Sequence, residues 1–250
     1  MSSSGAQPAA PPPAAETAPS ELAEPRPALT DESGEHEAAS RLLSRGAIRA
    51  LSARLPAEQR ERWRLLFNST MHGQSFNRFL KHVLDKGPTI VAVRDTAGHA
   101  FGGYAPEAWK LGPKFCGGYS CFLFSLAPEL KIHAASGANR NFQYVNDGME
   151  ALPNGVAFGG QHGHFGLWLH AGLDEGESSG VCSSFESPLF DAHTKFAVES
   201  VEVWATCVPT ERPSGDGAEA GEGGTVMQRK KVDKDFVAMA SNRTFASDNL

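Results

Sequence analysis

Three helical stretches are predicted by the spacing of large apolar residues in the first part of the globular region. One side of a helix that ends near Pro56 carries Leu42, Leu43, Ile48, Leu51 and Leu55. Residues 57–64 predict a second helical piece that opens with Pro56 in its first turn. We expect Ser75 to cap a third helix, which the Gly87-Pro88 pair stops. Its apolar residues match the i, i+3, i+4, i+7, i+8 pattern: Phe76, Phe79, Leu80, Val83 and Leu84.

After Pro88 the apolar period changes to two, which is typical of strands that bury one face. Residues 89–94 and 99–105 predict a hairpin around the turn 95–98, in which Gly98 takes positive φ. Further strands are predicted at residues 121–126, 130–134, 142–145, 156–159, 165–169 and 196–207. Many short strands without intervening helices favour a two-sheet antiparallel β-sandwich over a parallel α/β sheet. The predicted fold class is therefore mainly β with flanking helices (α+β).

The two ends of the chain differ from its middle in composition. The first 30 residues contain seven Pro and eight Ala with almost no large apolar side chains, so we predict a disordered tail over residues 1–38. One globular domain is predicted over residues 40–208. Residues 209–224 are rich in Gly, Glu and Ser and predict a flexible linker. In the basic segment 225–250, residues 226–240 predict a short amphipathic piece, either a docking helix or a frayed tail.

Charge and composition argue against several classes of partner. The formal net charge is −6 at pH 7 and the 23 Lys and Arg are scattered, so we expect no nucleic-acid partner. No apolar run is long enough to span a membrane, and the first residues show no signal-peptide pattern. Four cysteines without a CxxC pair favour a reducing compartment. We therefore expect a cytoplasmic protein without a transmembrane segment.

Five motifs follow one another in the globular region. They are RWRLLFNS with HGQSFN (residues 62–69 and 72–77), KGPT with RDTAGHAFGG (86–89 and 94–103), FLFSL (122–126), GGQHGHFGLW (159–168) and VEVW (201–204). In this order they resemble the TLD (TLDc) domain family. The GGQH stretch, LPNG (152–155), LPAEQR (55–60) and the basic segment after the linker are similar to one branch, the lysosome-associated, TOR-kinase-associated TLD protein.

The resemblance implies a fold and a set of partners, and it implies no catalytic activity. The fold would be a two-sheet sandwich with a few helices, and no catalytic residues are established for the family. The implied partners are the cytosolic sector of the vacuolar proton-translocating ATPase (V-ATPase) and TOR signalling, with a role in the oxidative-stress response. Two departures matter: Ser120 replaces the family's usual acidic residue, and the Pro/Ala tail with Ser2 replaces the branch's helical, myristoylated N-terminal region. Membrane association is therefore expected only through partners.

Histidines and glycines in the fourth motif raise two possible kinds of site. His162, His164 and His170 fall at even spacings and would share a face of a continuous strand, as a metal site requires. The interposed glycines interrupt that strand, so we favour polar histidines at the edge of a loop. Residues 159–166 lack both GxGxxG and GxxxxGK[ST]. They predict a tight turn that allows close packing of the following Phe165, Leu167 and Trp168, with phosphate binding as the less favoured alternative.

Cysteines offer another possible chemistry. Cys182, His193 and Asp191 are the residue types of a thiol nucleophile with its base and orienting carboxylate, but nothing in the sequence brings them together. Cys116 and Cys121 lie beside an aromatic strand, where cysteine usually behaves as a small hydrophobic residue. We predict no catalytic, cofactor-binding or metal-ligating residues, and no cofactor.

The leading hypothesis is a non-catalytic TLD adaptor or regulator. It would bind the V-ATPase or a TOR-signalling complex, and it would be cytoplasmic and peripheral at the lysosomal membrane. The alternative hypothesis is a thiol-based antioxidant protein that acts through Cys116, Cys121 or Cys182.

Overall fold

A computed structural model describes residues 26–180, 182–185, 190 and 194–207 of the chain. The chain divides into two units, 1–209 and 210–250, and all the described residues belong to the first. Among them, no helix combines the length and apolar character needed to cross a bilayer. The predicted linker at 209–224 and the predicted helix at 226–240 lie outside the described residues and stay predictions.

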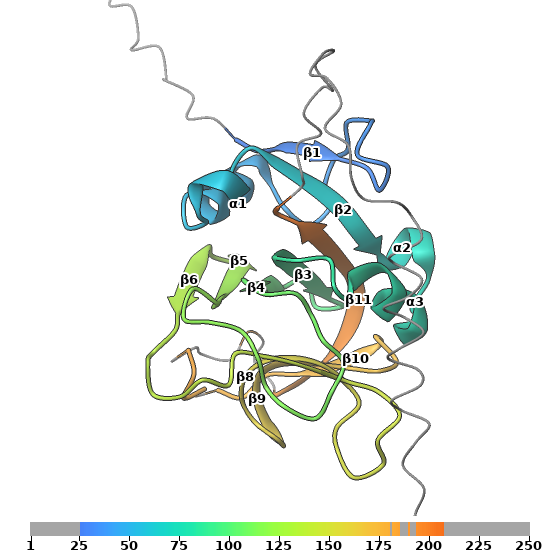
Figure 1. Cartoon of the computed structure of the whole chain (residues 1–250), viewed down its shortest axis with the longest axis vertical. Helices are drawn as coiled ribbons and strands as arrows, with labels where there is room; N and C mark the ends of the chain where they lie inside the picture. Colours follow the sequence, from blue (N-terminus) through green and yellow to red (C-terminus); the bar gives the residue numbers. More distant parts are fainter. Residues whose placement is uncertain (1–25, 181, 186–189, 191–193, 208–250) are drawn as a thin grey trace, which may run out of the picture. The chain divides into compact units, whose positions relative to one another are not determined.

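A first sheet forms the upper part of the body in Figure 1. Its strands are β1 (Ala28–Thr30), β2 (Arg62–Asn68), β3 (Thr89–Asp95), β4 (Ala100–Ala105), β5 (Phe122–Ala127), β6 (Lys131–Ala134) and most of β11 (Lys195–Ala205). They lie in the order β6-β5-β4-β3-β11-β2-β1. Every pairing in this sheet is antiparallel except that of β1 with β2.

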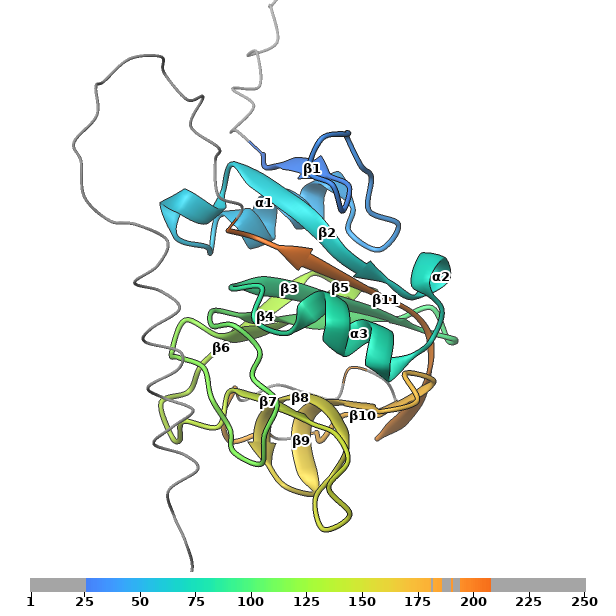
Figure 2. The same cartoon turned by 45° about the vertical axis from the view of Figure 1, so that its right-hand side comes forward.

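A second sheet packs against the first and shares one strand with it. It consists of β7 (Gln143–Asn146), β8 (Gly155–Gln161), β9 (His164–His170), β10 (Glu175–Glu177) and the beginning of β11. All its pairings are antiparallel. The register of β11 against β3 shifts between Val198 and Ser200, where the strand passes from one sheet to the other. The long last strand therefore ties the two layers together (Figure 2).

The core follows from the alternation of side chains along the strands. In β3, Val91 and Val93 face the second sheet, where they join Phe158 and Leu167 in the central core. The intervening Ile90 belongs to a separate cluster on the outer face of the first sheet. The segment that leads through α1 (Arg45–Ser52) covers that face with Leu42, Leu43, Ile48, Leu51 and Leu55. The predicted antiparallel β-sandwich with flanking helices is confirmed.

The helices agree with the apolar pattern but differ in length from the predictions. Helix α3 (Phe76–Val83) buries four of the five predicted apolar positions, whereas Leu84 lies just beyond its end and is partly buried. The Ser75 side chain makes no capping hydrogen bond among the described residues. Helix α1 is shorter than the predicted helix, because Leu42 and Leu43 precede it and donate their backbone N–H groups to Ser40 Oγ. The short α2 (Ser69–His72) follows β2.

Two N-terminal predictions are wrong. Residues 57–64 form only a 3-10 turn, Ala57–Gln59, because the backbone from Arg62 onward pairs with β11 as strand β2. The disorder predicted over residues 1–38 does not extend to its end, because β1 pairs with β2. Residues 1–25 lie outside the described residues. Both errors have one physical cause, since a partner strand distant in sequence satisfies the backbone groups of these segments.

Candidate functional site

Two cysteines, Cys116 and Cys121, are held in environments that suppress thiolate formation. Cys121 is 1% exposed, and its Sγ donates a hydrogen bond to the Tyr104 carbonyl oxygen at 2.9 Å. Burial raises the pKa of the Cys121 thiol well above its ordinary value. Cys116 is half-buried, and burial together with the nearby charge of Glu107 raises its thiol pKa too. Both shifts lower the fraction of thiolate, which is the form that attacks peroxide.

Cys182 is a packing residue that lies outside the strands, against β8 and β9 of the second sheet. It is 1% exposed, and its Sγ lies 2.8 Å from the position that a Cβ would take at either Gly159 or Gly166. These glycines make room for the sulfur atom. The proposed partners of this thiol, His193 and Asp191, lie outside the described residues, so that constellation stays a prediction.

Thiol reactivity gives a direct test of these environments. In the native full-length chain we expect iodoacetamide to modify the exposed Cys207 first, with Cys121 and Cys182 modified only as fast as the protein unfolds. Mass spectrometry of tryptic peptides over time measures each site, and guanidinium chloride should abolish the difference. Oxidation of Cys116, Cys121 or Cys182 by peroxide faster than a free thiol would instead support the antioxidant alternative.

The histidines of the glycine-rich motif do not gather around a common point. His162 lies in the turn between β8 and β9, where its ring contacts Tyr144 at a centroid distance of 5.0 Å. His164 begins β9 as an exposed residue, and His170 ends it within 3.5 Å of Glu177. A turn that contains Gly163 interrupts the strand that would have aligned all three side chains.

A group that the sequence analysis missed brings Glu32, His72 and His82 together. Glu32 Oε1 lies 2.5 Å from His72 Nε2, and its other oxygen lies 4.0 Å from His82 Nδ1. The two rings are 4.6 Å apart between centroids. Of the described His, Cys, Asp and Glu side chains, only these three form a group compact enough for a metal ion. Because the residues come from the loop after β1, from α2 and from α3, no spacing in the sequence signals the group.

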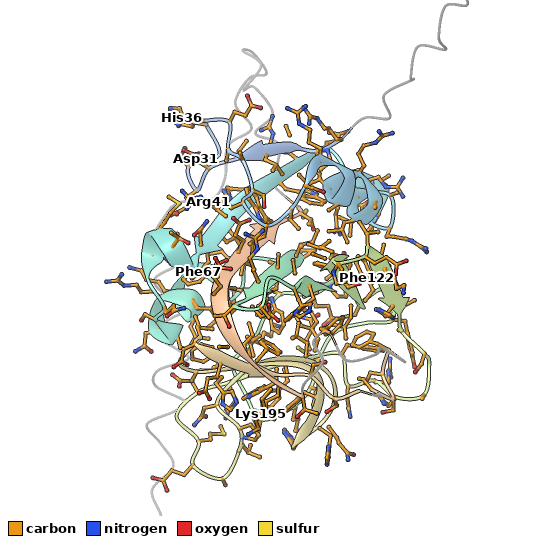
Figure 3. The ribbon with its side chains drawn as sticks, turned by 180° about the vertical axis from the view of Figure 1, so that it is seen from behind. Asp31, His36, Arg41, Phe67, Phe122 and Lys195 are labelled. Atoms are coloured by element: carbon orange, nitrogen blue, oxygen red, sulfur yellow. The ribbon has the colours of Figure 1, made fainter. Side chains whose placement is uncertain are left out.

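The hydrogen bonds of His72 favour a contact that holds the loop after β1 against the helices, and not a metal site. The Asn68 N–H donates to His72 Nδ1 at 3.0 Å, so the neutral ring carries its proton on Nε2, facing Glu32. That nitrogen then has no lone pair for a cation. The Glu32 carboxylate accepts a hydrogen bond from this N–H, and its other oxygen lies near His82, so it connects the loop after β1 to α2 and α3. In Figure 3 this loop is marked by Asp31 and His36.

A buried carboxylate fixes the segment between β1 and α1. Glu202 on β11 is 2% exposed, and its carboxylate accepts four hydrogen bonds. The donors are Ser40 Oγ at 2.5 Å, Arg41 N at 3.0 Å, Asn68 Nδ2 at 3.3 Å and Trp204 Nε1 at 3.1 Å. Burial of a charge is tolerated when its lone pairs are all satisfied in this way. The network therefore anchors Ser40 and Arg41 to the first sheet.

Two surface hollows lie beside α1 and share Arg26, and we call them together the arginine groove. The first encloses about 530 Å³, with Ala28, Leu29 and Ala38 among its lining residues and Arg45 from α1. The second encloses about 560 Å³ and is lined by Arg26, Arg49, Ser52, Ala53, Ala57, Arg60 and Glu61. The groove lies beside β1 and α1, which are labelled in Figure 1.

Comparison with known proteins agrees with the sequence motifs. The TLDc domain family model matches residues 36–206. The chain is 40% identical to MTOR-associated protein MEAK7 of Xenopus laevis over 66% of this chain and 36% of that protein. For MTOR-associated protein MEAK7 of Homo sapiens the identity is 38%, over 68% of this chain and 38% of the relative.

A second group of relatives shares the same region. Nuclear receptor coactivator 7 of Homo sapiens is 33% identical over 66% of this chain and 17% of its own length. The chain thus covers well under half the length of each of these relatives. The matched region coincides with the folded body, and the resemblance to the TOR-associated branch is confirmed. The chain belongs to the TLDc domain family.

Proposed function

We propose that the chain acts as a non-catalytic adaptor or regulator that binds a protein complex through its TLDc domain. The observation that carries this proposal is the match of residues 36–206 to the family, with relatives named for their association with MTOR. The V-ATPase or a TOR-signalling complex is the proposed partner, at the lysosomal membrane and in a role linked to stress protection. The cytoplasm is the compartment that fits such partners.

The organisation proposed for this role has three parts. Residues 40–208 form the rigid binding body, residues 209–224 act as a tether, and residues 226–240 act as a docking helix. Two observations support a role without catalysis: Cys121 and Cys182 are buried, and Ser120 stands where the family usually has an acidic residue. A tether raises the effective concentration of a docking helix at a second site on the same partner.

Affinity capture tests the proposed partners. The tagged full-length chain is incubated with cell lysate, and captured proteins are quantified by mass spectrometry against an unrelated β-sandwich protein. We expect enrichment of the V-ATPase cytosolic subunits or of TOR-complex subunits, and direct binding of the purified complex to follow. Enrichment of neither group over the control would overturn the proposal.

A further inference from the structure

Arginine side chains are concentrated around α1. Residues 41–64 contain seven Arg and two acidic residues, in a chain whose net charge is −6. The charges that appear scattered along the whole sequence are therefore locally dense in space, and four of them line the arginine groove: Arg26, Arg45, Arg49 and Arg60. Between residues 26 and 80 every basic residue other than histidine is Arg and none is Lys. The surface is thus a local cationic site on an acidic protein.

Most of these guanidinium groups are available to a ligand. Across the described residues, Arg26, Arg45 and Arg49 have no carboxylate within ion-pair distance. All three are exposed. Arg60 is held in place, because its Nε donates to the Leu55 carbonyl oxygen at 2.7 Å. A planar guanidinium binds a carboxylate through two parallel hydrogen bonds, a geometry that the ammonium group of Lys cannot provide.

The shape and rim of the groove favour a peptide over other anions. Its first hollow has partly buried apolar side chains in its lining, Leu29 and Ala38, which pack on the cluster below. An apolar centre within an arginine-containing rim is typical of protein interfaces, where Arg is enriched and Lys depleted. Glu37 and Glu61 also line the hollows, and they would repel a continuous polyanion such as a nucleic acid or an anionic bilayer. The groove therefore offers cationic sites for acidic side chains of a peptide beside an apolar site for one of its apolar side chains.

We propose that the arginine groove binds an acidic segment of a partner protein, with one apolar side chain of that segment in the hollow beside Leu29. The carboxylates of the segment would pair with Arg26, Arg45 and Arg49. This inference deepens the proposed function, on which it rests, by assigning the binding surface and the chemistry of the partner. Glu202 supports the site indirectly, because it anchors Ser40 in the wall of the first hollow.

Fluorescence anisotropy with a defined peptide tests the groove. The probe is a fluorescein-labelled peptide, Gly-Ser-Glu-Glu-Leu-Glu-Glu-Ser-Gly, titrated with the purified full-length chain. We expect binding that weakens with added salt, and that is lost when Lys replaces Glu in the peptide. The double variant Arg45→Glu/Arg49→Glu should weaken binding about tenfold or more. A matched variant, Lys81→Glu/Lys86→Glu, changes two exposed residues away from the groove by the same total charge and should bind within about twofold of the native chain.

A second variant separates the apolar contact from the charge. Ala39 is exposed and lines the first hollow, so Ala39→Trp should fill it without disturbing the core. We expect this variant to weaken binding of the leucine peptide but not of a peptide with Ser in place of Leu. Circular dichroism melting curves check that each variant is folded.

Four results would overturn the inference. The first is equal weakening of peptide binding by the two charge variants, and the second is equal binding of the Glu peptide and the Lys peptide to the native chain. The third is that Arg45→Glu/Arg49→Glu abolishes self-association of the chain and changes nothing else. The fourth is that the chain binds phosphatidylserine vesicles but not the peptide. Because the peptide assay uses the purified chain alone, its failure leaves the capture of a V-ATPase or TOR complex untouched. Conversely, failure of the capture experiment leaves the peptide result in place.

Discussion

Glu202→Ala should lower the free energy of unfolding by about 3 kcal/mol, because four donors lose their acceptor at once and two of them, Asn68 and Trp204, are buried. The donors come from three separate parts of the chain: Ser40 and Arg41 before α1, Asn68 at the end of β2, and Trp204 on β11 itself. Removal of the carboxylate leaves the buried Asn68 amide and Trp204 indole without this acceptor, and it removes the part-buried hydrogen bonds that hold Ser40 and Arg41. Urea denaturation followed by tryptophan fluorescence measures the change.

A control for this prediction lies on the same strand. Glu199 is exposed, so Glu199→Ala should change the unfolding free energy by less than about 0.5 kcal/mol. Glu202→Gln keeps the shape of the side chain but turns an amide donor toward the existing donors, and we expect it to destabilise the protein as well. If Glu202→Ala were no more destabilising than Glu199→Ala, the carboxylate would not be the anchor of the N-terminal segment.

Local sequence patterns predicted the elements whose stabilising contacts are close in sequence. Helix α3 buries the expected apolar stripe because its spacing places Phe76, Phe79, Leu80 and Val83 on one face. The β3–β4 hairpin was predicted from its turn, and Gly98 has φ +90° as expected. In both elements a repeating pattern of period 3.6 or 2 is enough to determine which side faces the core.

Elements and sites that depend on distant partners could not be predicted in this way. Strand β1 has only three residues, and its pairing with β2 joins segments separated by more than thirty positions. The Ser40–Glu202 hydrogen bond spans 162 positions. Neither contact leaves a periodic trace in the sequence. The arginine groove is an intermediate case, since the concentration of Arg over residues 41–64 is visible in the sequence, but the approach of Arg26 and Arg60 to α1 required the fold.

The same reasoning connects stability to the proposed binding surface. Ser40 lies in the wall of the arginine groove and is also held by Glu202. Destabilising this anchor should therefore alter the first hollow before the sandwich itself unfolds, because the central core lies between the two sheets and does not include Ser40. The groove thus depends on a polar network for its shape and on the apolar cluster beneath α1 for its position.

Gly160→Ala should also destabilise the protein by about 3 kcal/mol, from two effects that act together. Gly160 has φ +84°, a conformation that alanine adopts only with strain. In addition, a Cβ at this position would lie 2.0 Å from the His164 carbonyl oxygen. That oxygen belongs to the backbone of β9 and cannot rotate away as a side chain would. The strand pairing of β8 with β9 would have to shift to relieve the contact.

Gly163→Ala is the matched control, because it separates the two effects. Gly163 lies in the turn that follows β8 and has φ +83°, but nothing lies within 4 Å of the position of its Cβ. This variant should carry the backbone strain alone, about 1 kcal/mol. Denaturant unfolding of the two variants under identical conditions measures the difference, which we attribute to the clash with β9. Equal destabilisation by both substitutions would show that β9 can move, and that the glycine-rich motif serves its turn conformation and not close packing.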